Sequence, residues 1–299
     1  MKTNAIVRII LFSILALVLV GILAMSIMGY LGFRAFAGVA DTVSSYEQAV
    51  DPVSGEAMPA PEGSSVGSHS AAAKAEGIRE LEIKWLSGDV TIEAGNVEEI
   101  QFSETASDRP MHWYVQEDTL TIQFWEGKWP IVGPVPGKYR KDLKVVVPRE
   151  WAAEEISIEA VEADVELRNL VAEELEFDGV SGKFQAENCR IGEVDMDTVS
   201  GNIVYGGTLM ELDVDGVSAD CTLNLTNVPR EIQMDGVSGD LELTLPADAG
   251  LDVKVESASG KLTTDFAGTQ SGKSFYCGDG ACRVTVDGVS GSVRIYKAK

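Results

Sequence analysis

Residues 235–243, DGVSGDLEL, carry the pattern that decides the fold. Close copies occur as DGVSGKFQA at 178, DTVSGNIVY at 197, DGVSADCTL at 215 and DGVSGSVRI at 287. More divergent copies are WLSGDVTI at 85, AVEADVEL at 160 and ESASGKLTT at 256. Measured at the serine position (a glutamate at 162), successive copies from 162 onward lie 19, 19, 18, 20, 21 and 31 residues apart. A short, nearly fixed interval is typical of solenoids, whose units bury their apolar faces only against neighbouring units.

Apolar residues alternate with polar ones on both sides of the repeated serine. Around Ser218 they are Leu212 and Val214 before it, and Cys221 and Leu223 after it. The residue before the serine is also predicted to point inward, and these residues are Val180, Val199, Val217, Val237 and Val289. Alternation of period two predicts strands with one buried face. The change of parity predicts a corner, for which the Asp-Gly before the valine is suited.

Each repeat is therefore predicted to be strand, corner, strand. The expected fold is all-β, a parallel β-solenoid with coils of about 20 residues. An antiparallel β-sandwich is the alternative, because short strands with glycine turns suit that fold too. The nearly identical columns at a nearly fixed interval favour the solenoid.

The charge of the chain excludes one class of partner. The formal net charge is −23, with the acidic excess beyond residue 40. Such a surface repels nucleic acid, so DNA or RNA binding is not expected. The chain has only two histidines, His69 and His112, which removes the commonest general base and zinc ligand from most of it.

Residues 9–33 contain 25 residues without a charge. A helix of that length, at about 1.5 Å per residue, spans a lipid bilayer. A cleaved signal peptide is the alternative, but its apolar region usually has about 7–15 residues. Lys2 and Arg8 precede the span, which predicts a cytoplasmic N-terminus and an exported C-terminal domain, although Arg34 weakens the asymmetry. We expect a single-pass plasma-membrane protein whose cytoplasmic head and anchor are residues 1–34.

Residues 35–77 are rich in Ala, Gly, Ser and Pro and have no aromatic residue beyond Tyr46. This composition predicts a flexible extracytoplasmic stalk, in which His69 would be solvated. The β domain is then expected at residues 78–299.

Four pieces of the chain resemble a known family. They are IKWLSGDVTI at 83, LTIQFW at 120, DLKVVVP at 142 and the serial DGVSGD-type repeats. In these four pieces, residues 78–299 resemble the bacterial putative-adhesin family of β-strand repeats, a domain of unknown function. The resemblance implies a right-handed, single-stranded β-helix-like fold exposed at the bacterial surface. The resemblance implies no catalytic residues in this chain.

The position three before the serine is acidic in seven copies. These residues are Glu159, Asp178, Asp197, Asp215, Asp235, Glu256 and Asp287. Stacked carboxylates repel one another, and calcium would relieve that repulsion, with Asp178, Asp197, Asp215 and Asp235 as candidate ligands. The alternative, which an Asp-Gly pair favours, is that each aspartate accepts backbone N–H groups in its own turn. The serine column has no histidine nearby to act as a base, so it is interpreted as structural.

Residues 125–149 interrupt the repeats with interleaved aromatic and basic side chains. Such a segment predicts a contact loop for an anionic partner or a membrane surface. The alternative is a long connection whose aromatics pack back on the domain. The candidate binding residues are Trp125, Lys128, Trp129, Lys138, Tyr139, Arg140 and Lys141.

The cysteines give one further prediction. Cys277 and Cys282 bracket GDGA, and an exported location permits a disulfide between them. Cys221 fits the apolar column, and Cys189 has no obvious mate.

Three functions follow from these features. The first is a non-enzymatic, membrane-anchored surface module that binds a protein or polysaccharide. The second is an envelope-stress or signalling accessory that contacts a neighbouring membrane protein. The third and weakest is a carbohydrate-active β-helix enzyme, because such sites need a few different carboxylates in a cleft whereas these acids are equivalent. No enzymatic activity and no cofactor other than calcium are expected.

Overall fold

The computed structural model describes residues 65–66, 69–105, 110–125 and 140–298. The predicted anchor at 9–33 and most of the predicted stalk lie outside these residues. Every regular element in the described residues is a β-strand. No helix in the described part of the chain is long and apolar enough to cross a membrane. The strands are β1 (Ser65–Val66), β2 (Ser70–Lys74), β3 (Glu80–Gly95), β4 (Glu99–Glu104), β5 (His112–Gln116), β6 (Thr119–Gln123), β7 (Leu143–Pro148), β8 (Ala153–Arg168), β9 (Val171–Ser181), β10 (Lys183–Thr208), β11 (Glu211–Leu225), β12 (Glu231–Ser238), β13 (Leu241–Leu245), β14 (Leu251–Ser259), β15 (Leu262–Thr264), β16 (Thr269–Ser271), β17 (Ser274–Cys277), β18 (Cys282–Ser290) and β19 (Val293–Lys297).

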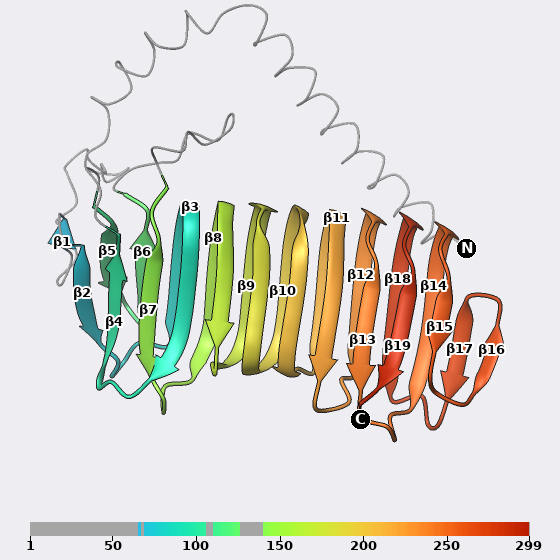
Figure 1. The fold of residues 1–299 in the computed structure, drawn as a ribbon. Helices are drawn as coiled ribbons and strands as arrows, with labels where there is room; N and C mark the ends of the chain where they lie inside the picture. The colour runs from blue at the N-terminus through green and yellow to red at the C-terminus, as the bar shows by residue number, and fades with distance from the viewer. Residues whose placement is uncertain (1–64, 67–68, 106–109, 126–139, 299) are drawn as a thin grey trace, which may run out of the picture. The chain divides into compact units, whose positions relative to one another are not determined.

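The repeats stack in parallel and in register (Figure 1). Ser218 in β11 pairs with Ser200 in β10 on one side and with Ser238 in β12 on the other. The second halves of the same repeats also pair in parallel, as Cys221 does with Ile203 and with Leu241. The repeat region is therefore β-solenoid-like, and the antiparallel sandwich is not adopted there. Antiparallel pairs occur toward the two ends of the stack, which makes the whole sheet mixed.

The C-terminal repeats do not stack in sequence order. β18 lies between β12 and β14, with Ser290 paired to both Ser238 and Ser259 (Figure 1). The outer edge of β14 is covered instead by β17, which forms an antiparallel hairpin with β16. This excursion accounts for the 31-residue interval between the last two copies. The edge at this end is then the short strand β16, and short edge strands limit pairing with other sheets.

The N-terminal end is closed by a different arrangement. β3, the isolated first copy, pairs directly with β8, so Ser87 lies beside Glu162. Its other edge pairs in parallel with β6 and β7, beyond which β2, β4 and β5 run antiparallel. β2 falls inside the predicted stalk, and its Ala73 is buried. The boundary predicted at residue 78 is therefore too late, because the alanines of β2 pair with β4 as part of the sheet.

The core lies between the two halves of each repeat. Phe177, before the corner of its repeat, meets Phe184, after the corner, with ring centroids 5.0 Å apart. Inward residues such as Leu212, Val214 and Leu223 are buried as predicted. The bend itself was misplaced: it occurs at the Ser-Gly step, where Gly182 has φ +135°. Alternation therefore continues through the preceding valine, and Val180, Val199 and Val289 point outward at 48%, 43% and 55% exposure.

Candidate interaction surface

The outward side of the first half of the repeats in β9, β10 and β11 forms a continuous acidic surface. Glu193, Asp195 and Asp197 of β10 pair in register with acidic residues on both neighbouring strands. The nine positions, called the acidic face below, are Glu174, Glu176, Asp178, Glu193, Asp195, Asp197, Glu211, Asp213 and Asp215. Neighbouring strands lie about 4.8 Å apart and alternate residues about 7 Å apart along a strand. The acidic face is thus a regular lattice of carboxyl groups.

Burial and, after it, repulsion between neighbours raise the pKa of carboxyls on this lattice. Burial, followed by repulsion from Asp215, Asp195 and Asp235, raises the pKa of Asp213 to about 6. The pKa of Asp178 is raised by burial and then chiefly by Glu176 and Asp197. Carboxyls that resist ionisation in this way release free energy when a cationic group comes near them.

Two columns of the acidic face were missed in the sequence. Only the position three before the serine was recognised, whereas the positions five and seven before it are equally acidic in β9, β10 and β11. The signal was present, because these positions have the same outward parity as the column that was recognised.

A calcium column is not supported by the geometry. In the described residues, no group of three or more His, Cys, Asp or Glu side chains is placed to hold a metal ion. The column members Asp178, Asp197, Asp215 and Asp235 lie at paired positions of successive strands.

The turn-bonding role belongs to a different aspartate of the repeat, two residues after the serine. Asp164 Oδ1 accepts a hydrogen bond from the backbone N–H of Lys183 at 2.8 Å. Asp220 Oδ1 accepts one from Asp240 N at 2.9 Å, and Asp240 Oδ1 accepts one from Ser292 N at 2.8 Å. Each bond crosses to the next strand of the stack. These aspartates therefore stabilise the corner, and the acidic face does not.

The serine column makes only long contacts. Ser181 Oγ donates to Val161 O at 3.4 Å, and Ser238 Oγ donates to Ser218 Oγ at 3.4 Å. These link one repeat to the next, which fits the structural interpretation of the column.

We expect the stability of the protein to rise as the pH falls from about 7.5 to about 5.5 at low salt. An unfolded aspartate has a pKa of about 3.9, whereas Asp213 has a folded pKa of about 6. The folded state then binds more protons in that window, so acidification favours it. Asp213→Asn should raise Tm at pH 7 by roughly 1–3 °C and flatten the profile, as followed by thermal denaturation.

Asp240→Asn is the matched control for that experiment. The backbone N–H of Ser292 lowers the pKa of Asp240, so its ionised form contributes stability that is lost on acidification. Its amide variant should therefore be less stable at neutral pH. An equal Tm for wild type and Asp213→Asn at every pH would contradict repulsion on the acidic face.

The outward valines form a second feature beside the acidic face. They occupy the position before the serine in five adjacent strands, in the order β9, β10, β11, β12 and β18. This set, called the valine ridge below, is Val180, Val199, Val217, Val237 and Val289. Val217 and Val237 are half-buried and the other three are exposed. The valine ridge runs along the corner of the stack, next to the aspartates at position minus three.

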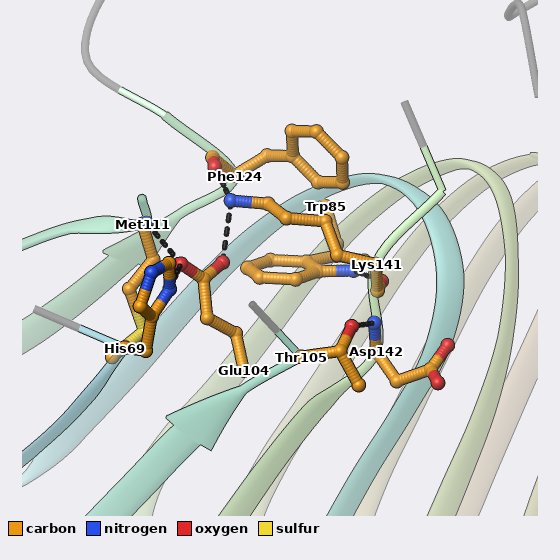
Figure 2. Close-up of polar contacts among 8 residues, drawn as sticks. All are labelled: His69, Trp85, Glu104, Thr105, Met111, Phe124, Lys141 and Asp142. Carbon is orange, nitrogen blue, oxygen red and sulfur yellow. Dashed lines mark hydrogen bonds and ion pairs between the residues drawn. The ribbon is translucent and has the colours of Figure 1, made fainter. Parts of the chain in front are cut away.

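A buried ion pair lies near the N-terminal end of the same corner (Figure 2). Lys141 Nζ lies 2.5 Å from Glu104 Oε2, and the two side chains are 2% and 0% exposed. Lys141 Nζ also donates to the carbonyl of Phe124 and lies 4.3 Å from the centroid of that ring. Burial lowers the pKa of Lys141, while the bond to Glu104 opposes this shift. Because the pair is closed to solvent, it is not open to a ligand. It links the chain segments that contain Glu104, Phe124 and Lys141.

Glu104 has two further partners in the N-terminal part of the domain (Figure 2). Its Oε1 accepts the backbone N–H of Met111 at 2.7 Å and lies 3.0 Å from His69 Nδ1. His69 was expected to be solvated in a linker. It is instead a half-buried partner of Glu104, because β2 brings it to the end of β4.

The predicted basic-aromatic contact loop is only partly described. Lys128, Trp129, Lys138 and Tyr139 lie outside the described residues. Trp125 is 8% exposed and Lys141 is buried in the ion pair, so neither is available to a partner. Arg140 is exposed and pairs with Asp89 at 2.8 Å. The prediction for Trp125 and Lys141 was wrong because sequence cannot show that Glu104 neutralises Lys141.

Comparison with known proteins decides the family. The family model described as Toastrack DUF4097 matches residues 73–296. The chain belongs to the Toastrack family. Its match begins within β2 and ends within β19, which agrees with the early domain boundary seen in the structure. No curated protein matches the chain.

Three solved structures are similar to the chain at low identity. A putative cell adhesion protein of Clostridium sporogenes has 16% identity and a TM-score of 0.39, covering 77% of this chain and 98% of that one. A putative adhesin of Bacteroides fragilis has 12% identity and a TM-score of 0.46, covering 76% and 95%. A putative lipid-binding protein of Parabacteroides distasonis has 12% identity and a TM-score of 0.32, covering 81% and 99%.

The cysteines of this Toastrack domain are all free and buried. Cys277 and Cys282 both pair with Leu251, but from opposite sides, so β14 lies between them. Two strand spacings are about 10 Å, beyond the roughly 7 Å that a disulfide can bridge. The predicted disulfide is therefore absent from the structure, because the residues between the cysteines carry the chain to the other side of β14.

Proposed function

We propose that this Toastrack protein is a membrane-anchored, non-enzymatic binding module that holds a cationic partner on its acidic face. The observation that carries the proposal is the register of β9, β10 and β11, which places nine carboxyl groups on one side of the sheet. Eight of these residues are exposed, so a partner can reach them without rearrangement of the fold, whereas the half-buried Glu211 pairs with Arg230.

The energetics of such a surface suit recognition by charge. A lattice of like charges raises the local concentration of cations and accelerates their association, an effect that salt screens. Burial first, and repulsion from neighbouring aspartates second, raises the pKa of Asp213. A partner bearing several lysines or arginines would relieve that repulsion.

The placement of the domain in the cell is part of the proposal. Residues 9–33 would anchor the chain in the plasma membrane, with residues 1–8 cytoplasmic and the β domain outside. The segment between the anchor and β2 would act as a stalk. The repeats would wind as a right-handed coil of about 20 residues per turn, as in a solenoid of this kind. The partner would then be a surface or envelope protein or a cationic wall component.

The test is binding of a lysine-rich peptide to the full chain in neutral phosphatidylcholine nanodiscs, followed by fluorescence anisotropy with empty nanodiscs as the blank. The triple variant Glu176→Gln, Asp195→Asn, Asp213→Asn removes one charge from each central strand of the acidic face. At about 0.5 kcal/mol for each exposed pair, we expect affinity to fall by about tenfold.

A charge-matched variant controls for net charge. The triple variant Glu187→Gln, Asp248→Asn, Asp265→Asn removes the same number of exposed acids at positions outside the acidic face. Its affinity should stay close to that of the wild type. Equal weakening by both triple variants would show that only net charge matters and would refute the proposal.

A further inference from the structure

The valine ridge is the one extended apolar feature on the described surface that the fold does not use. Val180, Val199 and Val289 are among the few large hydrophobic side chains with more than 40% exposure. They do not lie singly, since the pairing of their strands places them in one row with Val217 and Val237. A continuous exposed apolar row beside charged residues is typical of an interaction site.

The first copy shows which charges meet beside this corner. At β3 the equivalent position is Leu86, which is only 3% exposed. There the segment around Lys141 runs along the corner: its backbone N–H donates to Ser87 O at 3.1 Å. Arg140, next to it, pairs with Asp89 two residues after Ser87. The segment beside the corner is therefore basic, and the cation of Arg140 meets a corner carboxylate.

The spacing of the valine ridge selects the shape of a partner. Its five valines lie in adjacent strands, about 4.8 Å apart, so the row is about 19 Å long. Same-face residues of an extended strand recur at about 7 Å, which is out of step with the row. Side chains at i and i+3 or i+4 of an α-helix are about 5–6 Å apart, close to the row spacing. A helix of about 13 residues would cover it.

We propose that the valine ridge and the aspartates beside it bind a cationic amphipathic α-helix of a partner protein. The apolar stripe of the helix would lie along the valine ridge. Lysines or arginines on one flank would face Asp178, Asp197, Asp215, Asp235 and Asp287, which hold the position two residues before each valine. This proposal rests on the proposed function and names the partner class for the same side of the stack.

The test uses two peptides of identical leucine and lysine composition, one with the leucines on a single helical face and one shuffled. Both are titrated into the full chain in neutral phosphatidylcholine nanodiscs, with empty nanodiscs as the blank. The amphipathic peptide should bind about tenfold more tightly than the shuffled one, which corresponds to about 1.4 kcal/mol.

Three substitutions separate the apolar contact from the charge. The triple variant Val199→Thr, Val217→Thr, Val237→Thr makes the valine ridge polar. It keeps β-branched side chains and hence strand propensity. The preference for the amphipathic peptide should fall to about twofold or less. The acidic-face triple variant should instead weaken both peptides alike.

The outcomes are distinguishable. Equal binding of both peptides to the wild type, or no effect of the threonine variant, would overturn the helix proposal. The proposed function would then survive if the acidic-face variant still weakened binding. Loss of that charge effect would refute both. Self-association of the chain that the threonine variant abolishes would show that the ridge binds a second copy, which also overturns the proposal.

Discussion

Lys141→Met is expected to lower the free energy of unfolding by about 3–5 kcal/mol, because it leaves Glu104 buried without its cation. The loss should also loosen the contacts that Lys141 makes with Phe124 and, through its carbonyl, with the Trp85 indole at 2.8 Å. In a domain of this size each kcal/mol lowers Tm by about 2–4 °C. Chemical denaturation of the full chain measures the effect.

Two companion variants make the Lys141 result specific. Arg140→Ala removes a neighbouring cation from an exposed pair, so it should cost less than about 1 kcal/mol. Lys141→Met combined with Glu104→Leu removes both buried charges and should recover part of the lost stability. A Lys141→Met protein as stable as the wild type would contradict the buried pair.

Gly182→Ala is the second substitution with a large expected effect. Gly182 has φ +135°, and a Cβ there would lie 2.2 Å from the carbonyl oxygen of Ala163 in the neighbouring strand. The strained backbone and the clash should together cost about 3–5 kcal/mol, because the corner must open to relieve them. Thermal denaturation at neutral pH measures the loss.

Gly272→Ala is the control for the corner. Gly272 also has positive φ, +61°, but nothing lies within 4 Å of a Cβ there. Only the left-handed conformation is then penalised, at about 1–2 kcal/mol. If the two alanine variants lose the same stability, close stacking at the Ser-Gly corner is not what requires glycine.

Much of the fold could be predicted from the sequence because equivalent positions of successive repeats pair with one another. Inward residues such as Leu212 and Leu223 were identified from alternation alone, and the repeats stack as their spacing indicated. The order of the last repeats could not be predicted. The close copy with Ser290 and the more divergent copy with Ser259 both fit the stack, and the sequence alone does not show which of them meets Ser238.

The surface was harder to predict than the core. Val199 was placed inward because apolar residues are usually buried, and only the position of the bend shows otherwise. Lys141 looked like an exposed base because its partner Glu104 lies 37 residues away in sequence. Pairing of charges across such distances leaves no local signal, whereas the parity of Asp195 and Asp213 would have revealed the acidic face.

The most direct test of the central claim is site-specific photo-crosslinking of the full chain in its own cell envelope. A photoreactive residue at Asp195, in the centre of the acidic face, is compared with one at Glu187, which is exposed elsewhere on β10. We expect a discrete adduct from position 195 that weakens in high salt and is absent from position 187. Identical adducts from both positions, or none from position 195, would contradict it.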